Sequence, residues 1–431
     1  MIVRIGRNGE IEKEVNKTIQ ETLIVMDMGH SHAMEYAPIN PTETSQIAVV
    51  LMHCDQNYMG LKMAPALAER GYHVLACESV EGGEIDRKFM MLDSAIRYLR
   101  QNKEIEKIIL MGHSGGATLM TAYQSIAENG PEIYQGDEMI YKCTLKEKPA
   151  AADGLMLIDA NYGNGVMSLL SMDPAVEEEG NGMKLNPEYD IFDPANGYDP
   201  AGAHYSEEFI KKYQSAQKAR NDKLIALALE RLEKIQKGEG NYVDDEPFFI
   251  TAADQPKPNN RLLPEDTHFL SHTKGEYDLV HGDGTVTHER IYSLRTAECD
   301  RCFSNTYGMG VNKNTVKGFL SAQALRTTEE FAVLEDGIVG VDWKSSYASP
   351  IGNIDGITVP TLLMGMTGGY EYLASEMIYE RAKMEDVTIA FVRGATHMFF
   401  PNRDAEKTPG EFGDTENALY DYMAKWMKRF A

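Results

Sequence analysis

The sequence predicts an α/β protein built on a mostly parallel central sheet. Short continuous apolar runs recur along the chain, and segments with apolar residues at helical spacing lie between them. Such runs are typical of strands that are buried on both faces. Strands alternating with helices form βαβ units, which place a parallel sheet between helices on both faces. At 431 residues, the chain has room for one large domain with an insertion, or for about two or three smaller units.

We expect residues 1–44 to form an N-terminal β-hairpin extension. Extended runs at residues 2–5 and 11–15 flank Arg7-Asn8-Gly9, and an Asn-Gly pair suits the positive φ angles of a tight hairpin turn. A third extended run follows at residues 22–26.

Residues 45–162 are expected to form the first part of the α/β core. The predicted strands are 47–52, 73–77, 107–111 and 154–158, and the predicted helices are 58–70, 89–100 and 117–128.

The alternation then stops, and residues 163–355 are expected to form an inserted cap domain. This segment is rich in Gly, Pro, Asn, Asp and Tyr, and a structureless stretch of that length is improbable inside a compact domain. One amphipathic helix is predicted near residues 206–237, because Ser206 suits an N-cap and Gly238 follows the last periodic residue.

The α/β pattern resumes at residues 356–431, the predicted second part of the core. Strands are expected at 359–364 and 387–392, and helices at 374–383 and 417–430.

Composition excludes several classes of protein. The chain has 42 basic and 66 acidic side chains, a net charge of −24, and no basic run, so a nucleic-acid partner is not expected. Its apolar stretches fall short of the ~20 residues that a membrane span needs. With no secretory signal and five scattered cysteines, we expect a cytoplasmic protein without a disulfide framework.

The strongest chemical signal is Gly112-His113-Ser114-Gly115-Gly116. It lies between a predicted buried strand and a predicted helix, which is the context that a G-x-S-x-G nucleophile elbow requires. Small neighbours let the backbone pass close to the serine, and the helix N-terminus directs N–H groups at a developing oxyanion.

Here the chain resembles the α/β-hydrolase superfamily, in particular its serine esterases and lipases with a large inserted cap. The resemblance covers residues 45–162 and 356–431, and it implies a triad in the order serine, acid, histidine. His397 follows the last predicted strand, where the family places its base. A neutral imidazole there takes the proton of Ser114 and returns it to the leaving group.

The acid of the triad has three candidates. The family usually carries an Asp after the strand predicted at 359–364, but this sequence has none there. Glu371 is nearest to that place and is the preferred candidate. Glu376 is an alternative, although an acidic residue in a first helical turn is also favoured by the helix dipole. Asp159, at the end of the preceding strand, is where some hydrolases place their acid.

The oxyanion hole is expected to use the backbone N–H of Gly115. The resemblance implies a second donor in the loop after the first long core strand, from the N–H of Cys54 or Asp55. An Asp beside an oxyanion is unfavourable unless its side chain points away or is paired.

A second pattern, Cys299-Asp-Arg-Cys302, has C-x-x-C spacing. Together with two of the histidines His268, His272 and His281, these cysteines would form a Cys2His2 zinc site. Reduced thiols and solvated histidines explain the pattern more simply.

We therefore expect a serine hydrolase that cleaves an ester, lactone or thioester of a small to medium, largely apolar molecule. No metal or organic cofactor is required, and the expected partners are a small-molecule substrate and a second copy of the chain. Amide or C–C hydrolysis, acyl transfer, a non-catalytic ligand receptor, and an interaction protein working through the insertion remain alternatives, because fold alone does not determine function.

Overall fold

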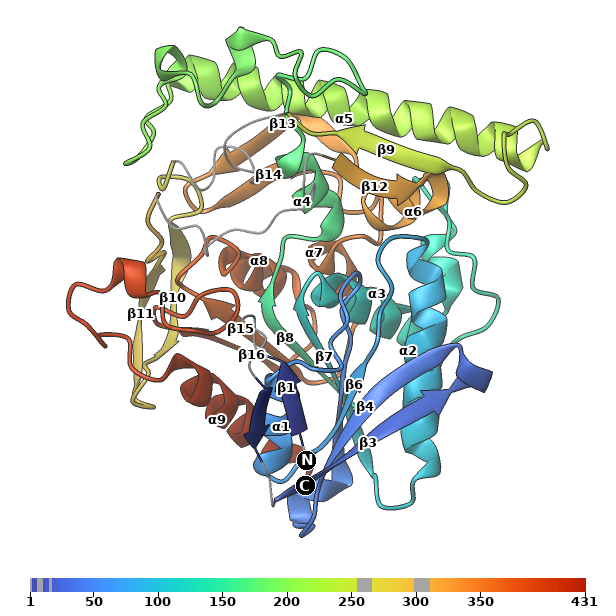
Figure 1. Ribbon diagram of the computed structural model, residues 1–431, viewed down its shortest axis with the longest axis vertical. Helices are drawn as coiled ribbons and strands as arrows, with labels where there is room; N and C mark the ends of the chain where they lie inside the picture. Colours follow the sequence, from blue (N-terminus) through green and yellow to red (C-terminus); the bar gives the residue numbers. More distant parts are fainter. Residues whose placement is uncertain (1, 6–10, 15–17, 254–265, 298–310) are drawn as a thin grey trace.

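A mostly parallel sheet forms the centre of the computed structural model, which describes residues 2–5, 11–14, 18–253, 266–297 and 311–431 (Figure 1). Within these residues the strands of the sheet are β3 (Ile19–Met26), β4 (Ser31–Pro38), β5 (Ile47–Leu51), β6 (His73–Cys77), β7 (Lys107–Ser114), β8 (Gly154–Ala160), β10 (His272–Val280), β11 (Val286–Tyr292), β15 (Thr361–Met366) and β16 (Val387–Val392). Their spatial order is β11-β10-β16-β15-β8-β7-β5-β6-β4-β3. Neighbours from β10 to β6 are parallel, and the outer pairs are antiparallel. The predicted fold class is confirmed.

Helices cover both faces of this sheet. They are α1 (Met63–Glu69), α2 (Ile85–Gln101), α3 (Gly116–Asn129), α8 (Leu373–Arg381) and α9 (Thr415–Met427). Side chains alternate across a strand, so Val49 of β5 packs with α1 and α9, whereas Val50 packs with α2, α3 and α8. This is why the strands are continuous apolar runs.

The sheet extends beyond the predicted core segments. β3 and β4 come from the predicted N-terminal extension, and β10 and β11 come from within residues 163–355. The edge strand β11 is exposed along most of its length, so it has no apolar run by which the sequence could reveal it. β1 (Ile2–Ile5) and β2 (Ile11–Glu14) pair as the predicted hairpin, whose turn lies outside the described residues.

The other described residues between 163 and 355 pack above the sheet (Figure 1). Its elements are α4 (Asn164–Ser171), α5 (Glu207–Gln236), β9 (Pro247–Thr251), β12 (Val311–Thr315), α6 (Val316–Ala322), β13 (Thr327–Leu334), β14 (Gly337–Val341) and α7 (Pro350–Asn353). The predicted long helix is α5, and the Ser206 hydroxyl accepts the Phe209 N–H at 3.1 Å as its N-cap. Leu224 and Ala228 of α5 belong to the same apolar cluster as α2 and α3.

One predicted helix begins later than expected. The helix expected at 58–70 is α1, which starts at Met63. Proline has no N–H to donate and is tolerated only in a first helical turn, so Pro65 requires the helix to begin close to it. Among the helices of the described residues, none combines the length and the apolar character needed to cross a membrane.

Candidate active site

Ser114 lies on a strained turn at the end of β7. Its φ is +55°, in the left-handed region that non-glycine residues rarely adopt. α3 begins two residues later, at Gly116, so the serine stands between a buried strand and a helix N-terminus. Strain of this kind persists only where the surroundings enforce it, and it is concentrated at functional sites.

Two glycines allow this turn to form. A Cβ atom on Gly112 would lie 2.6 Å from the carbonyl oxygen of Gly116, and one on Gly116 would lie 2.7 Å from the carbonyl oxygen of Met52. Both contacts are with backbone atoms, which cannot swing aside. The small residues of the motif are therefore required by close backbone packing.

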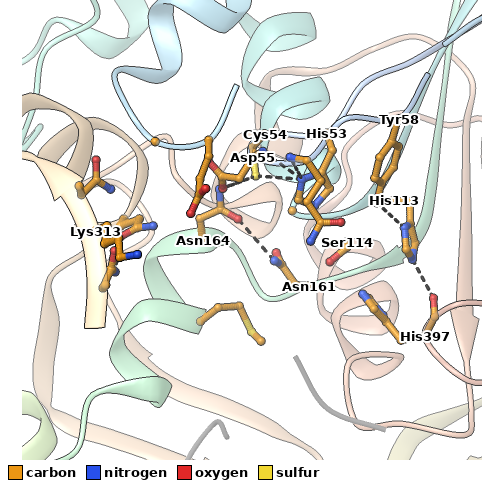
Figure 2. A pocket seen from close by; sticks show the side chains of 18 of the residues that line it. His53, Cys54, Asp55, Tyr58, His113, Ser114, Asn161, Asn164, Lys313 and His397 are labelled. Carbon is orange, nitrogen blue, oxygen red and sulfur yellow. Dashed lines mark hydrogen bonds between the residues drawn. The ribbon is translucent and has the colours of Figure 1, made fainter. Parts of the chain in front are cut away.

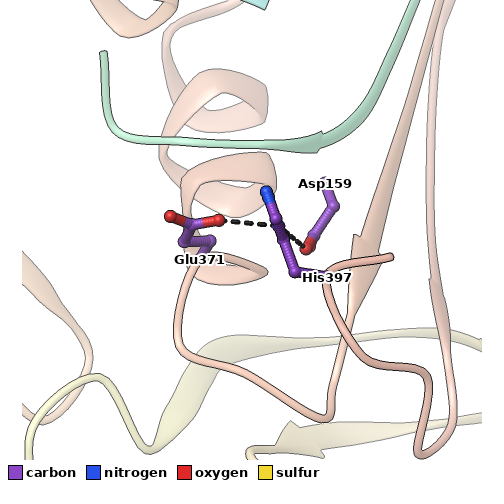
Figure 3. A group of neighbouring side chains, drawn as sticks. All are labelled: Asp159, Glu371 and His397. Atoms are coloured by element: carbon purple, nitrogen blue, oxygen red, sulfur yellow. Dashed lines mark hydrogen bonds and ion pairs between the residues drawn. The ribbon is translucent and has the colours of Figure 1, made fainter. Parts of the chain in front are cut away.

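His397 meets two carboxylates at one ring nitrogen (Figure 3). Its Nδ1 is 2.7 Å from Oδ2 of Asp159 and 2.7 Å from Oε2 of Glu371. Asp159 belongs to β8, and Glu371 lies just after the neighbouring strand β15. The side chains of Asp159 and Glu371 are only 2% and 4% exposed, so water does not shield either charge.

The two carboxylates are not equivalent. Nδ1 of His397 donates its hydrogen to Oδ2 of Asp159, whose Oδ1 accepts the Met366 N–H at 2.8 Å. The Nδ1–H is directed at Asp159, whereas both oxygens of Glu371 are buried without a hydrogen-bond partner among the described residues and Oε2 contacts Nδ1 only as an ion pair. Asp159 is therefore better placed than Glu371 to orient His397, which reverses the order of preference expected from the sequence.

Glu376 is not at this site. Its carboxylate accepts the backbone N–H groups of Lys274 and Gly275 at 2.9 Å, so it fastens α8 to β10. The structure thus explains Glu376 as a structural residue and removes it as a candidate acid.

The carboxylates determine the charge state of the histidine. Burial by itself lowers the pKa of His397, but the contacts with Glu371 and Asp159 outweigh burial and raise it to about 10. Burial also raises the pKa of Asp159, against the opposing effect of the His397 hydrogen bond. A proton is therefore held readily within this cluster of three groups.

Asp159, Glu371 and His397 are also the only group of potential metal ligands found among the described residues, and their ligand atoms all lie within 4.8 Å of one another. The contact between Nδ1 and Asp159 is explained by their hydrogen bond and does not need a metal ion. Cys299 and Cys302, considered for zinc, lie outside the described residues. Of their possible partners, His268 and His272 both contact Glu335, at 2.9 Å and 3.4 Å.

Two amides remain available for an oxyanion. Within the described part of the chain, the N–H groups of Gly115 and Cys54 donate to no acceptor. The N–H of Asp55 donates to Nδ1 of His53 at 3.0 Å, so Asp55 is not a free donor and Cys54 is the better of the two expected candidates.

The Asp55 carboxylate is paired, as its position requires. Its Oδ1 is 2.8 Å from Nζ of Lys88, and the Lys88 side chain is only 1% exposed. Burial raises the pKa of Asp55, but Lys88, the Cys54 thiol and His53 together outweigh burial and lower it overall. The Cys54 thiol donates to the second oxygen of Asp55 at 3.0 Å, and burial raises its pKa well above the usual value, so Cys54 is not a thiolate nucleophile.

Two histidines that the sequence analysis did not select support the site (Figure 2). His53 accepts the N–H groups of Asp55 and Gln56 at Nδ1, which leaves its hydrogen on Nε2, and burial lowers its pKa to about 4. His113 accepts the Tyr58 hydroxyl at 2.7 Å and donates Nε2–H to the backbone carbonyl of His397 at 2.8 Å. His113 thus holds the loop that carries His397. As the variable residue of the G-x-S-x-G motif, it has no sequence signal of its own.

Ser114, Gly115, Cys54 and His397 open into one pocket of about 660 Å³. Most of its other lining side chains are polar, and Met167, Val311 and Met398 are the apolar ones. This lining differs from the cavity expected for a largely apolar substrate.

No protein-family model and no curated protein matches this chain. Solved structures resemble it weakly. A soluble variant of monoglyceride lipase from Saccharomyces cerevisiae, in complex with a substrate analog, is 10% identical over 97% of both chains, with a TM-score of 0.43. The α/β hydrolase GrgF from Penicillium sp. sh18 is 10% identical over 95% of this chain and 98% of its own, with a TM-score of 0.42. A monoacylglycerol lipase from Paleococcus ferrophilus is 13% identical over 93% of this chain and 100% of its own, with a TM-score of 0.39.

The assignment of the fold rests on the chain's own geometry. Its parallel strands follow the order β6-β5-β7-β8-β15-β16, helices cover both faces, and a strained serine ends the central strand β7. This chain has the α/β-hydrolase fold.

Proposed function

We propose that this chain is a serine hydrolase that cleaves a carboxylic ester through an acyl-enzyme on Ser114. The observation that carries the proposal is that the strained Ser114 opens into the same pocket as His397, whose Nδ1 is held by Asp159. A hydroxyl becomes a useful nucleophile when an oriented base takes its proton.

The proposed reaction has two halves. Oγ of Ser114 attacks the ester carbonyl carbon while Nε2 of His397 takes the hydroxyl proton. The N–H groups of Gly115 and Cys54 hold the oxyanion of the tetrahedral intermediate. The intermediate collapses, the C–O bond breaks, and His397 gives the proton to the departing alcohol. Water, deprotonated by His397, then attacks the acyl carbon. The bond between this carbon and Oγ of Ser114 breaks, His397 returns the proton to Oγ, and the carboxylic acid is released.

Asp159 orients His397 in this scheme and stabilises its imidazolium form. The missing Asp after the predicted strand 359–364 is the feature that favours the receptor alternative. Because Asp159 and Glu371 both contact Nδ1 of His397, that reason for preferring a receptor is gone.

The test is hydrolysis of 4-nitrophenyl acetate by wild-type protein, Ser114→Ala and His397→Gln. Loss of either triad member should lower kcat by about 10⁴-fold or more. Ser215→Ala, on the exposed face of α5, is the matched control and should keep wild-type activity. Equal turnover by wild type and folded Ser114→Ala would contradict the proposal.

A further inference from the structure

Carboxamide side chains surround the pocket around Ser114. They come from the loop after β5, from the start of α4 and the residues before it, from β12, and from the residue after α6. They are Gln56, Asn161, Asn164, Asn312, Asn314 and Gln323. In Figure 2, Lys313 of β12 lies on the opposite side of Ser114 from His397. The β12 residues and Gln323 thus form a polar arm of the pocket, away from the triad.

The amides nearest the triad are already satisfied. Nδ2 of Asn164 donates to the Cys54 sulfur at 3.0 Å, and Oδ1 of Asn161 accepts the Gly163 N–H at 2.9 Å. These two side chains brace the loop beside the proposed oxyanion hole, and they do not need a ligand.

The amides of the polar arm keep unused groups. Nδ2 of Asn312 donates to Oε1 of Gln323 at 2.6 Å, and Oδ1 of Asn314 accepts the Thr315 N–H at 2.9 Å. Oδ1 of Asn312, Nε2 of Gln323 and Nδ2 of Asn314 have no partner among the described residues. One acceptor and two donors are therefore available on the pocket wall.

Burial makes these unused groups informative. Asn312 and Asn314 are only 3% and 6% exposed and Gln323 is partly buried, so the packing around them holds these side chains in place on the pocket wall. An apolar substrate would remove the remaining water and leave three amide groups unpaired, which is costly. A hydroxyl group both donates and accepts, so a hydroxyl-bearing substrate matches this mixture.

The charges of the pocket favour a neutral ligand. Lys313 lines it and forms no ion pair among the described residues, but the acidic Glu81 and Asp55 line it too. The chain as a whole carries a net charge of −24, which repels anions.

We propose that the substrate is an ester of a neutral, hydroxyl-rich alcohol such as a sugar or polyol. Its hydroxyl groups bind Asn312, Asn314 and Gln323 while its acyl carbon meets Ser114. This inference rests on the proposed function, because it assigns the leaving-group side of that reaction.

The test compares three fluorophosphonate probes of similar size that react with an activated serine. One carries a pyranose arm, one a cyclohexyl arm and one a carboxycyclohexyl arm. The labelling rate of Ser114 by each probe is measured by intact mass on wild type, Gln323→Met and Asn312→Leu. Gln101→Met, at the exposed end of α2, is the matched control.

The pyranose probe should label wild type about tenfold faster than the cyclohexyl probe. The cyclohexyl arm leaves one or two amide groups of the polar arm unpaired, which lowers the labelling rate by about that factor. Gln323→Met should lose this preference, so that the pyranose and cyclohexyl probes label it at rates within about twofold of each other. Asn312→Leu should behave in the same way, and Gln101→Met should resemble wild type.

Faster labelling by the cyclohexyl probe would overturn the inference and leave the serine hydrolase standing. Fastest labelling by the carboxylate probe would overturn it in favour of an anionic substrate held by Lys313. Failure of all three probes to label folded wild-type protein would instead contradict the proposed function itself.

Discussion

At the scale of single residues, the protonation state of His397 governs the proposed hydrolysis. An imidazole can act as a base only when its Nε2 is free of a proton. Two buried carboxylates at Nδ1 favour the doubly protonated ring and raise the pKa of His397 to about 10. The site therefore combines one acid that orients the base, Asp159, with a second, Glu371, that restrains its release of a proton.

The two acids should respond differently to conversion into amides. Asp159→Asn removes the acceptor that orients His397, so kcat for 4-nitrophenyl acetate should fall by about 10³–10⁴-fold. Glu371→Gln removes a carboxylate that makes no hydrogen bond to Nδ1, so activity at neutral pH should be kept or raised. Glu376→Gln, another buried glutamate, is the control and should stay near wild type in kcat.

The opposite pattern, a crippled Glu371→Gln beside an active and folded Asp159→Asn, would show that Glu371 is the orienting acid. Unfolding transitions recorded for all three variants separate loss of catalysis from loss of fold.

The pH dependence follows from the raised pKa of His397. Because the base must be neutral, kcat/KM should rise with pH through a pKa well above the ordinary 6.5 and reach half of its plateau near pH 10. Glu371→Gln removes one negative charge, so its profile should shift to lower pH. A wild-type profile that levels off below pH 7, unchanged in Glu371→Gln, would contradict this account.

The same shift has a consequence for stability. A histidine whose pKa is raised on folding stabilises the native state fully below its unfolded pKa of about 6.5. That contribution is lost as the pH rises through about 10, the pKa of His397 in the folded protein. The gain in activity at alkaline pH is thus accompanied by a loss of stability.

At the scale of elements, the turn between β7 and α3 is what makes Ser114 available. The turn brings the start of α3 against the end of β5, with Gly116 beside the Met52 carbonyl. The position of the nucleophile therefore depends on the packing of one helix N-terminus against one strand end.

Gly116→Ala should damage both fold and activity. The added methyl would lie 2.7 Å from the Met52 carbonyl oxygen, so α3 or the end of β5 must move. We expect a loss of about 1–3 kcal/mol in the free energy of unfolding, measured by chemical denaturation, together with a lower kcat. Gly60→Ala is the control, because a Cβ there meets nothing within 4 Å. Equal stability and activity in the two variants would contradict the close packing of the elbow.

At the scale of the whole molecule, the strong negative charge should select among substrates. An anionic ester is repelled at low ionic strength, and salt screens that repulsion as the Debye length falls from about 30 Å at 0.01 M to about 8 Å at 0.15 M. The kcat/KM for a carboxylate-bearing ester should therefore rise by about threefold or more over this range, while that of a neutral ester of equal size stays level. A fall in kcat/KM for the anionic ester would instead indicate attraction by Lys313.

The parallel core strands could be predicted from the sequence, because each is buried on both faces and its apolar run is therefore continuous. Ser114 could be predicted from the glycines of its turn, and His397 from its place after the last strand. The edge strand β11 and its neighbour β10 could not be predicted, since β11 is mostly exposed and β10 only partly buried, so neither needs a continuous apolar run.

The partner of His397 could not be chosen from the sequence for a different reason. Asp159 lies in β8 and Glu371 follows β15, two strands that are far apart in the chain but adjacent in the sheet, so both reach the same ring nitrogen. The polar arm of the pocket could not be predicted for the same reason. β12 pairs with β9, about sixty residues earlier, and Asn312 and Asn314 of β12 line the pocket.

The most direct test of the central claim is intact-mass analysis with peptide mapping after treatment with a simple alkyl fluorophosphonate. We predict a single adduct on wild-type protein that maps to Ser114, no adduct on Ser114→Ala, and slow labelling of Asp159→Asn. A folded wild-type protein that takes up no probe, or an adduct mapped to another residue, would contradict the assignment of Ser114 as the activated nucleophile.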